Sequence, residues 1–197
     1  MGCGDRVSFD RAEERDPQGR SMSRATYEAM LREGKPNSLG RTEEVTRLVL
    51  ADRRNIRSLY ACYRSDDEWV RLRVSSTFKR VFHQRPQWFD AWIDRFIDEV
   101  AVIDQPSAQW TFCLLMERHA ARLDTGQTRR AKRKVKNILE NTEDWIVENN
   151  AMQALGLWAV DDARLRTWLR PRLEARIDDR RKSVAGRAKR LLARLPS

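Results

Sequence analysis

The groups best suited to bind an anion form a basic run in the last third of the chain. Residues 129–136 read RRAKRKVK, and the whole chain carries a net charge of +10. Residues 125–197 hold 18 basic and 9 acidic groups, whereas the first 124 residues hold 21 and 20. Phosphate contacts need only clustered cations. The candidate anion- or nucleic-acid-binding residues are Arg129, Arg130, Arg133 and Lys134, and the alternative interpretation is a solvated helix face.

Residues that could support catalysis show no comparable clustering. Neither His83 nor His119 has metal-ligand spacing to another His or Cys. The sequence contains no Gly-rich phosphate loop and no nucleophile elbow. We therefore expect a protein that is not an enzyme, with no catalytic residues, no metal and no cofactor. The three cysteines are sparse and odd in number, which favours a reducing cytoplasm, with Cys62 and Cys113 as buried thiols.

A helical pattern that recurs about every 38 residues must position these groups. Each copy places apolar or small residues at i, i+4, i+7 and i+8, which is one stripe of a helix. Recurrence of helical patterns at such a period is typical of a repeat array. The sixteen positions of the pattern are Val70, Val74, Thr77, Phe78, Ala108, Phe112, Leu115, Met116, Val147, Ala151, Ala154, Leu155, Val184, Ala188, Leu191 and Leu192.

Between these inner helices the sequence predicts outer ones. One outer helix should follow Pro86, with Phe89, Trp92, Ile93, Phe96 and Val100 as its stripe. Others should follow Thr125 and Asp162. The predicted fold is all-α: a solenoid of about four helix pairs with an N-terminal helical cap. The predicted divisions are a disordered leader at 1–22, the cap at 23–53 and the solenoid at 54–197, with no segment apolar enough to span a membrane.

Stacked helix pairs curve into a superhelix, so the inner helices should line a concave groove. Positions just after the first anchor of each inner helix are expected to point into that groove. They mix both charge signs with a large aromatic side chain, which suits a protein or peptide better than a bare phosphate chain. The predicted partner-binding groove residues are Arg71, Gln109, Trp110, Glu148 and Asn149.

The acidic turn followed by Val-x-x-Arg resembles the HEAT repeat. The clearest copies span 66–78 and 180–192, with Arg73 and Arg187 at the arginine position, while Thr111 and Asn150 replace it in the middle copies. The resemblance covers the chain from about Thr42 and extends to short bacterial HEAT-repeat proteins, many without an assigned function. It implies that this arginine bonds to the acidic turn of a neighbouring repeat. The implied structural ladder consists of Arg73, Arg187, Asp66 and Asp67.

Three functional hypotheses remain open on the sequence. The first is a non-enzymatic scaffold or adaptor, cytoplasmic and monomeric, that holds a protein partner in its groove. The second is nucleic-acid binding through the basic C-terminal third. The third is a DNA glycosylase of the HEAT-like class, although this chain is shorter and that class's pocket of aromatic and Asp residues has no placeable counterpart here.

Overall fold

The computed structural model describes residues 22–196, and all of their regular structure is helical. The leader predicted for 1–22 lies outside this range except for Met22, whose backbone N–H donates to Asn55 Oδ1 at 2.7 Å. The α-helices are α1 (Arg24–Arg32), α2 (Thr42–Ala51), α3 (Asn55–Ala61), α4 (Glu68–Gln84), α5 (Ile93–Asp98), α6 (Pro106–Arg118), α7 (Thr125–Asn141), α8 (Trp145–Ala159), α9 (Ala163–Glu174) and α10 (Lys182–Leu192). The 3-10 turns are η1 (Cys62–Arg64), η2 (Pro86–Trp88), η3 (Asp90–Trp92), η4 (Val100–Val102) and η5 (Ala120–Arg122).

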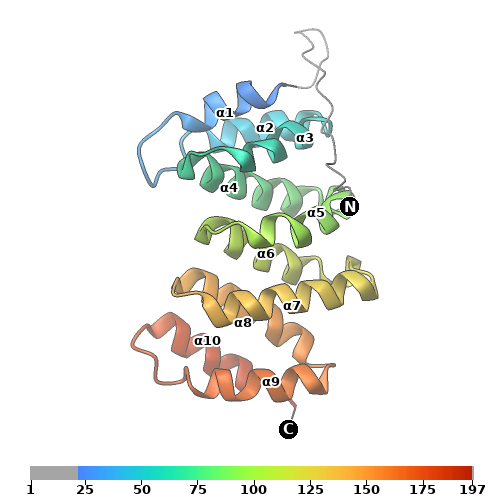
Figure 1. The fold of residues 1–197 in the computed structure, drawn as a ribbon, viewed down its shortest axis with the longest axis vertical. Coiled ribbons are helices and arrows are strands. Elements are labelled where there is room, and N and C mark those ends of the chain that lie inside the picture. The colour runs from blue at the N-terminus through green and yellow to red at the C-terminus, as the bar shows by residue number, and fades with distance from the viewer. Residues whose placement is uncertain (1–21, 197) are drawn as a thin grey trace, which may run out of the picture.

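Successive groups of helices follow one another along the long axis of the molecule, from α1 at one end to α9 and α10 at the other (Figure 1). Four of them form a continuous row in which α4 contacts α6, α6 contacts α8, and α8 contacts α10. We call these the row helices. The intervening helices flank the row: α7 contacts α5 and α8, and α9 contacts α8 and α10. The N-terminal helices close one end, where α1 and α2 pack on α4.

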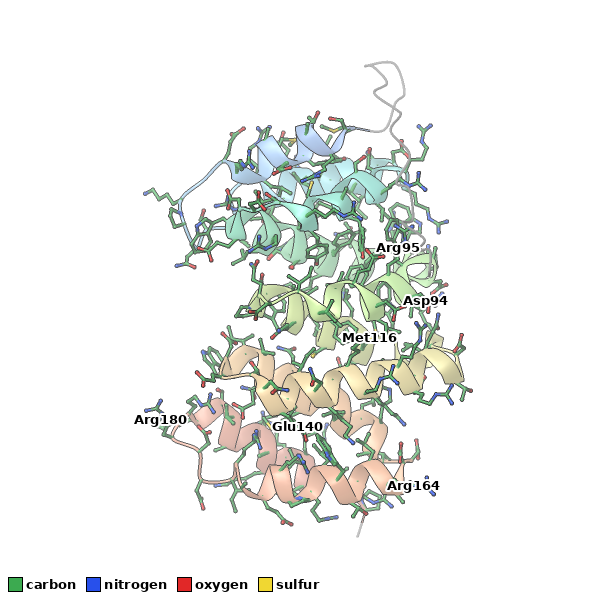
Figure 2. The ribbon with its side chains drawn as sticks, in the orientation of Figure 1. Asp94, Arg95, Met116, Glu140, Arg164 and Arg180 are labelled. Atoms are coloured by element: carbon green, nitrogen blue, oxygen red, sulfur yellow. The ribbon has the colours of Figure 1, made fainter. Side chains whose placement is uncertain are left out.

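The repeating apolar pattern of the sequence is the buried face of the row helices. Fifteen of its sixteen positions are buried, and Leu192, at the end of α10, is half-buried. Burying a full apolar side chain contributes about 1.5–3 kcal/mol, so this stripe is what holds successive helices together. Met116 is one such residue, on α6 (Figure 2). The buried thiols expected at Cys62 and Cys113 are also confirmed, and burial raises the pKa of Cys62 to about 12.

Aspartate side chains start several of these helices. Asp67 Oδ1 accepts from the backbone N–H groups of Trp69 and Val70, and Asp144 does the same for Ile146 and Val147. Such caps satisfy N–H groups that have no partner within the helix. At α7, Asp124 and Gln127 form a reciprocal capping box. The acidic turns before α4 and α8 are therefore helix caps, whereas α10 has no side-chain cap.

The prediction of a single outer helix after Pro86 is wrong. Residues 86–102 instead form η2, η3, the short α5 and η4. The apolar residues Phe89, Trp92, Ile93 and Phe96 recur at i, i+3, i+4 and i+7, as in an α-helix, so their spacing does not predict the break. Phe89 and Phe96 are fully buried, with ring centroids 5.3 Å apart, so packing of the aromatic rings is kept although the helix is broken.

Candidate functional site

The predicted groove residues do not form one surface. Arg71 is half-buried, and its guanidinium donates to Gln105 Oε1 and, at 2.6 Å, to the carbonyl oxygen of Ser65. Gln109 donates to the carbonyl oxygen of Ile103 at 3.4 Å. It lines a cavity of about 690 Å³ beside α7. Both side chains are thus held by contacts within the protein.

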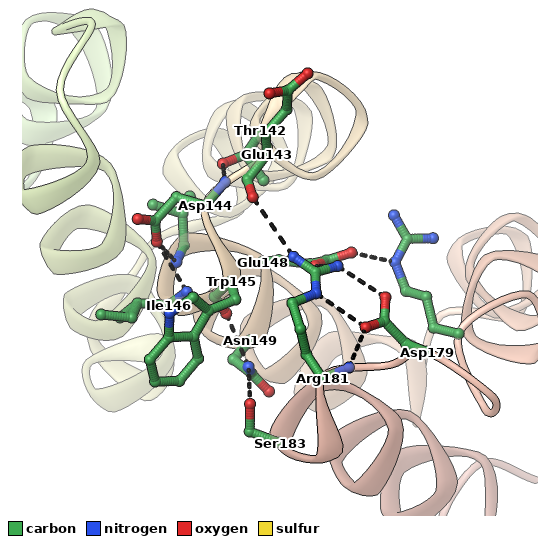
Figure 3. Close-up of polar contacts among 12 residues, drawn as sticks. Thr142, Glu143, Asp144, Trp145, Ile146, Glu148, Asn149, Asp179, Arg181 and Ser183 are labelled. Carbon is green, nitrogen blue, oxygen red and sulfur yellow. Dashed lines mark hydrogen bonds and ion pairs between the residues drawn. The ribbon is translucent and has the colours of Figure 1, made fainter.

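Glu148 and Asn149 are buried, which corrects their placement in an open groove. Glu148 Oε1 accepts from Arg176 Nε at 2.6 Å, and Oε2 lies 2.7 Å from Arg181 Nη2 (Figure 3). Asn149 Nδ2 donates to the carbonyl oxygen of Trp145 at 2.8 Å. The connection between α9 and α10, which carries Arg176 and Arg181, covers this part of α8. On α8, the two positions that follow Val147, the first residue of the buried pattern, therefore face the α9–α10 helix pair and not an open groove.

A different side of the row helices is open to solvent. On α8 it carries residues at i, i+4, i+7 and i+11, namely Ile146, Asn150, Gln153 and Leu157, of which Ile146 is 38% and Leu157 42% exposed. On α6 the half-buried Trp110 and Leu114 share this side with Glu117. We call this surface the four-helix face. It comprises Lys79, Arg80, Trp110, Leu114, Glu117, Arg118, Ile146, Asn150, Gln153, Leu157, Arg187, Arg190 and Arg194.

Polar contacts run across the four-helix face from helix to helix. Lys79 Nζ of α4 lies 4.7 Å from the ring centroid of Trp110 on α6. Gln153 Nε2 of α8 donates to Glu117 Oε1 of α6 at 3.4 Å, and Arg187 Nη1 of α10 donates to Gln153 Oε1. These contacts place side chains of all four row helices on one continuous surface. Of the predicted groove residues, only Trp110 belongs to it.

Positive charge gathers at the two ends of the four-helix face. Lys79, Arg80 and Arg118 lie together at one end, and Arg187, Arg190 and Arg194 at the other. None of these six cations has an ion pair with a carboxylate among residues 22–196. Burial and the two neighbouring arginines lower the pKa of Lys79. The ends of the face therefore carry an excess of positive charge, which Glu117 on the same face partly offsets through its attraction to Arg187.

Of these cations, Arg187 was expected from the sequence to belong to the structural ladder, and the other five were not singled out: Lys79, Arg80, Arg118, Arg190 and Arg194. The signal that could have found them is their position on the side of each row helix away from the buried stripe. What the sequence does not show is that the sides of four separate helices join into one surface.

The arginines of the implied ladder bond to groups other than the acidic turns. Arg73 is 1% exposed, and its guanidinium donates to the carbonyl oxygens of Leu31, Lys35 and Ser38, at 2.5, 2.9 and 3.0 Å. It therefore fastens the segment after α1 to α4, where the carbonyl groups at a helix C-terminus attract a cation.

The remaining ladder residues also depart from the expectation. Arg187 bonds to Gln153. Asp67 caps α4 and lies 3.8 Å from Arg32 Nε, while Asp66 is exposed. The acidic turn before α10 does meet an arginine closely, since the carboxylate of Asp179 pairs with Arg181 at 2.8 Å (Figure 3).

The four predicted anion-binding residues of α7 point in different directions. Arg130 pairs with Asp94 and, at 2.7 Å, with Asp98 of α5. Lys134 lines the cavity of about 690 Å³, which Arg133 also borders. Arg129 and Arg133 line a larger groove of about 780 Å³. We call this the α7–α9 groove; its walls are Leu123, Thr125, Thr128, Arg129, Lys132, Arg133, Lys136, Asn137, Glu140, Asp162, Arg164 and Leu165.

The two histidines lie in unlike surroundings. His119 is 4% exposed and packs on Phe89, with ring centroids 4.7 Å apart. Burial, with Arg122 nearby, lowers its pKa to about 4. His83 is exposed near the end of α4. Within residues 22–196 no three His, Cys, Asp or Glu side chains are grouped so that they could hold a metal ion.

No helix in the described part of the chain has both the length and the apolar character needed to cross a lipid bilayer. Comparison of the sequence with protein-family models and with curated proteins finds no match. Any function must therefore be argued from the chain's own surfaces.

Proposed function

We propose that the protein is a non-enzymatic binding module that holds an acidic segment of a partner protein across the four-helix face. The observation that carries this proposal is the pattern of charge on that face. Three cations at each end lack carboxylate partners within residues 22–196, and the stretch of α8 between them is uncharged. A complementary ligand carries negative charge at its two ends and apolar groups between them.

The proposed architecture is a solenoid of HEAT-like helix pairs. It is supported by the chain-order contacts among the row helices and by the recurring buried pattern. Repeat arrays of this kind present a long surface made of equivalent sides of successive helices. The four-helix face is such a surface, which is why we assign the binding role to it rather than to a single loop.

The centre of the face favours a protein over a nucleic acid. Ile146 and Leu157 expose apolar groups, and Asn150 and Gln153 between them can donate and accept hydrogen bonds. Apolar contact at the centre with polar contact at the rim is the usual arrangement of protein interfaces. A surface made for a phosphate backbone would continue its positive charge across α8.

The experiment that tests this proposal is affinity capture from the source cell, with and without nuclease, using three forms of the protein. They are the wild type, the charge reversal Arg187→Glu/Arg190→Glu, and the matched control Lys182→Glu/Lys189→Glu. All four positions lie on α10, but Lys182 and Lys189 lie about 140° and 160° around the helix from Arg187, and about 80° and 100° from Arg190. Both double variants change the net charge by the same amount.

We expect the wild type and the control to retain the same protein partner after nuclease treatment, and the Arg187→Glu/Arg190→Glu variant to lose it. The captured protein should also dissociate as salt is raised, because exposed charge pairs are screened. Recovery of nucleic acid alone, or equal capture by both double variants, contradicts the proposal.

A further inference from the structure

The α7–α9 groove combines a suitable size with an excess of positive charge. Its volume of about 780 Å³ lies in the range of small-molecule sites, about 300–1,000 Å³. Its lining includes five cations and two carboxylates, Glu140 and Asp162. Figure 2 labels Glu140 on α7 and Arg164 at the start of α9, one from each side of the groove.

Both carboxylates already have a basic partner. Asp162 Oδ2 lies 2.8 Å from Lys132 Nζ, and Asp162 also caps α9 through the backbone N–H of Leu165. Glu140 Oε1 lies 2.9 Å from Arg172 Nη2. Each carboxylate is therefore already paired with one cation, and neither forms an ion pair with another cation of the lining.

Four cations of the lining have no carboxylate partner among residues 22–196: Arg129, Arg133, Lys136 and Arg164. Three of them lie at i, i+4 and i+7 on one side of α7 and span about 10 Å along its axis. Lys136 Nζ also lies 4.2 Å from the ring centroid of Trp168, which holds it against α9. The hydroxyl groups of Thr125 and Thr128 and the amide of Asn137 add neutral donors.

From this geometry we propose that the α7–α9 groove is a phosphate-binding site for a ligand with two or more phosphate groups. Arg129, Arg133, Lys136 and Arg164 bind the phosphate oxygens. Arginine suits this role because its planar guanidinium can donate two parallel hydrogen bonds to a phosphate. A span of about 10 Å reaches beyond a single phosphate group. The ligand is either a stretch of nucleic-acid backbone or a free polyphosphate compound.

This site is separate from the four-helix face. Its cations belong to α7 and α9, whereas those of the face belong to α4, α6, α10 and the residues just after α10. The inference therefore does not depend on the proposed protein partner. It also reduces the number of residues in the run RRAKRKVK that are assigned to phosphate binding. Arg130 is paired with carboxylates of α5, and Lys134 borders the smaller cavity.

The test measures binding of two probes, a fluorescein-labelled 20-base-pair DNA duplex by anisotropy and inorganic pyrophosphate by calorimetry. The variant is Arg129→Glu/Arg133→Glu. The matched control is Lys134→Glu/Lys182→Glu, which makes the same change in net charge away from the groove. Circular dichroism and thermal melts check that both variants keep the wild-type fold.

We expect the groove variant to weaken binding of at least one probe by more than tenfold and the control to weaken it by less than threefold. If the ligand is a nucleic-acid backbone, the duplex binds in the micromolar range with a log–log salt slope of about −3, as about three phosphate contacts require. If the ligand is a free polyphosphate, pyrophosphate binds to the wild type. The affinity for the duplex then falls no more in the groove variant than in the control. Absence of binding by both probes at 50 mM salt, or equal losses in both variants for both probes, overturns the inference.

Discussion

Gly156 of α8 faces Leu191 of α10 so closely that a methyl group built on Gly156 would lie 2.6 Å from Leu191 Cδ2. Leu191 is 4% exposed, so its side chain has little room to move away. The absence of a side chain at position 156 lets the last row helix approach α8. Glycine here serves close packing, since it lies inside a helix with no positive φ.

This contact gives a prediction about packing in the row. Gly156→Val should destabilise the fold by about 1–3 kcal/mol through overpacking. Combining it with Leu191→Ala should recover part of that loss, because the smaller residue makes room for the added methyl groups. Denaturant unfolding of both single variants and the double variant measures the coupling. Additive effects, with no recovery, would mean that α8 and α10 do not pack at these residues.

The Arg73 guanidinium is expected to hold the N-terminal helices to the row. Arg73→Ala should lower the free energy of unfolding by more than about 3 kcal/mol, because buried hydrogen bonds to a charged group are worth about 1.5–3 kcal/mol each. Arg80→Ala is the control, since Arg80 lies on the same helix, is half-buried and donates a local hydrogen bond to the carbonyl oxygen of Ser76. Its effect should stay within about 1 kcal/mol. Similar losses in the two variants would contradict the fastening role of Arg73.

His119 should make stability depend on pH in a defined window. Its pKa in the folded protein is about 4, below the ordinary value of about 6.5, so the unfolded chain binds more protons between these values. Stability due to the neutral, buried ring is therefore full above pH 6.5 and is lost as pH falls toward 4. His119→Leu should show a smaller fall in melting temperature from pH 7 to pH 4.5 than the wild type. Parallel curves for the two proteins would show that His119 does not titrate in this way.

Trp110 is predicted to contribute more to binding than to stability. It is half-buried on the four-helix face beneath Lys79, whereas Trp158 on α8 is 9% exposed. Trp158→Ala should cost about 3–5 kcal/mol of stability. Trp110→Ala should cost less than half of that and still reduce partner capture. Thermal melts and partner-capture experiments on both variants test this prediction. An equal loss of stability in the two variants would mean that Trp110 is a core residue.

Periodicity in the sequence was enough to identify the row helices. Val70, Ala108, Val147 and Val184 each begin a buried stripe, as their spacing predicts. The aspartate turns were likewise recognisable, because Asp67 and Asp144 stand just before the first apolar residues of their helices. Both features depend on residues close together in the sequence, and there local physical rules hold well.

The candidate site was harder to predict because it depends on contacts between distant segments. Glu148 is covered by Arg176 and Arg181, which lie about 30 residues further along, and no local pattern near Glu148 indicates this. Arg73 bonds to carbonyl groups of a loop whose path the sequence does not specify. The basic run of α7 divides among three environments, because neighbouring positions on a helix differ by 100°.

The most direct test of the central claim, that the four-helix face holds a protein partner, is site-specific photo-crosslinking in the source cell. A photoreactive amino acid replaces Leu157, which is 42% exposed on the α8 part of the face, or Lys189, which is exposed on α10 but does not belong to the face. We predict that position 157 yields a discrete crosslinked protein that withstands nuclease and disappears in the Arg187→Glu/Arg190→Glu background, while position 189 yields none. A crosslink at position 189 alone, or one at position 157 that nuclease removes, would contradict the claim.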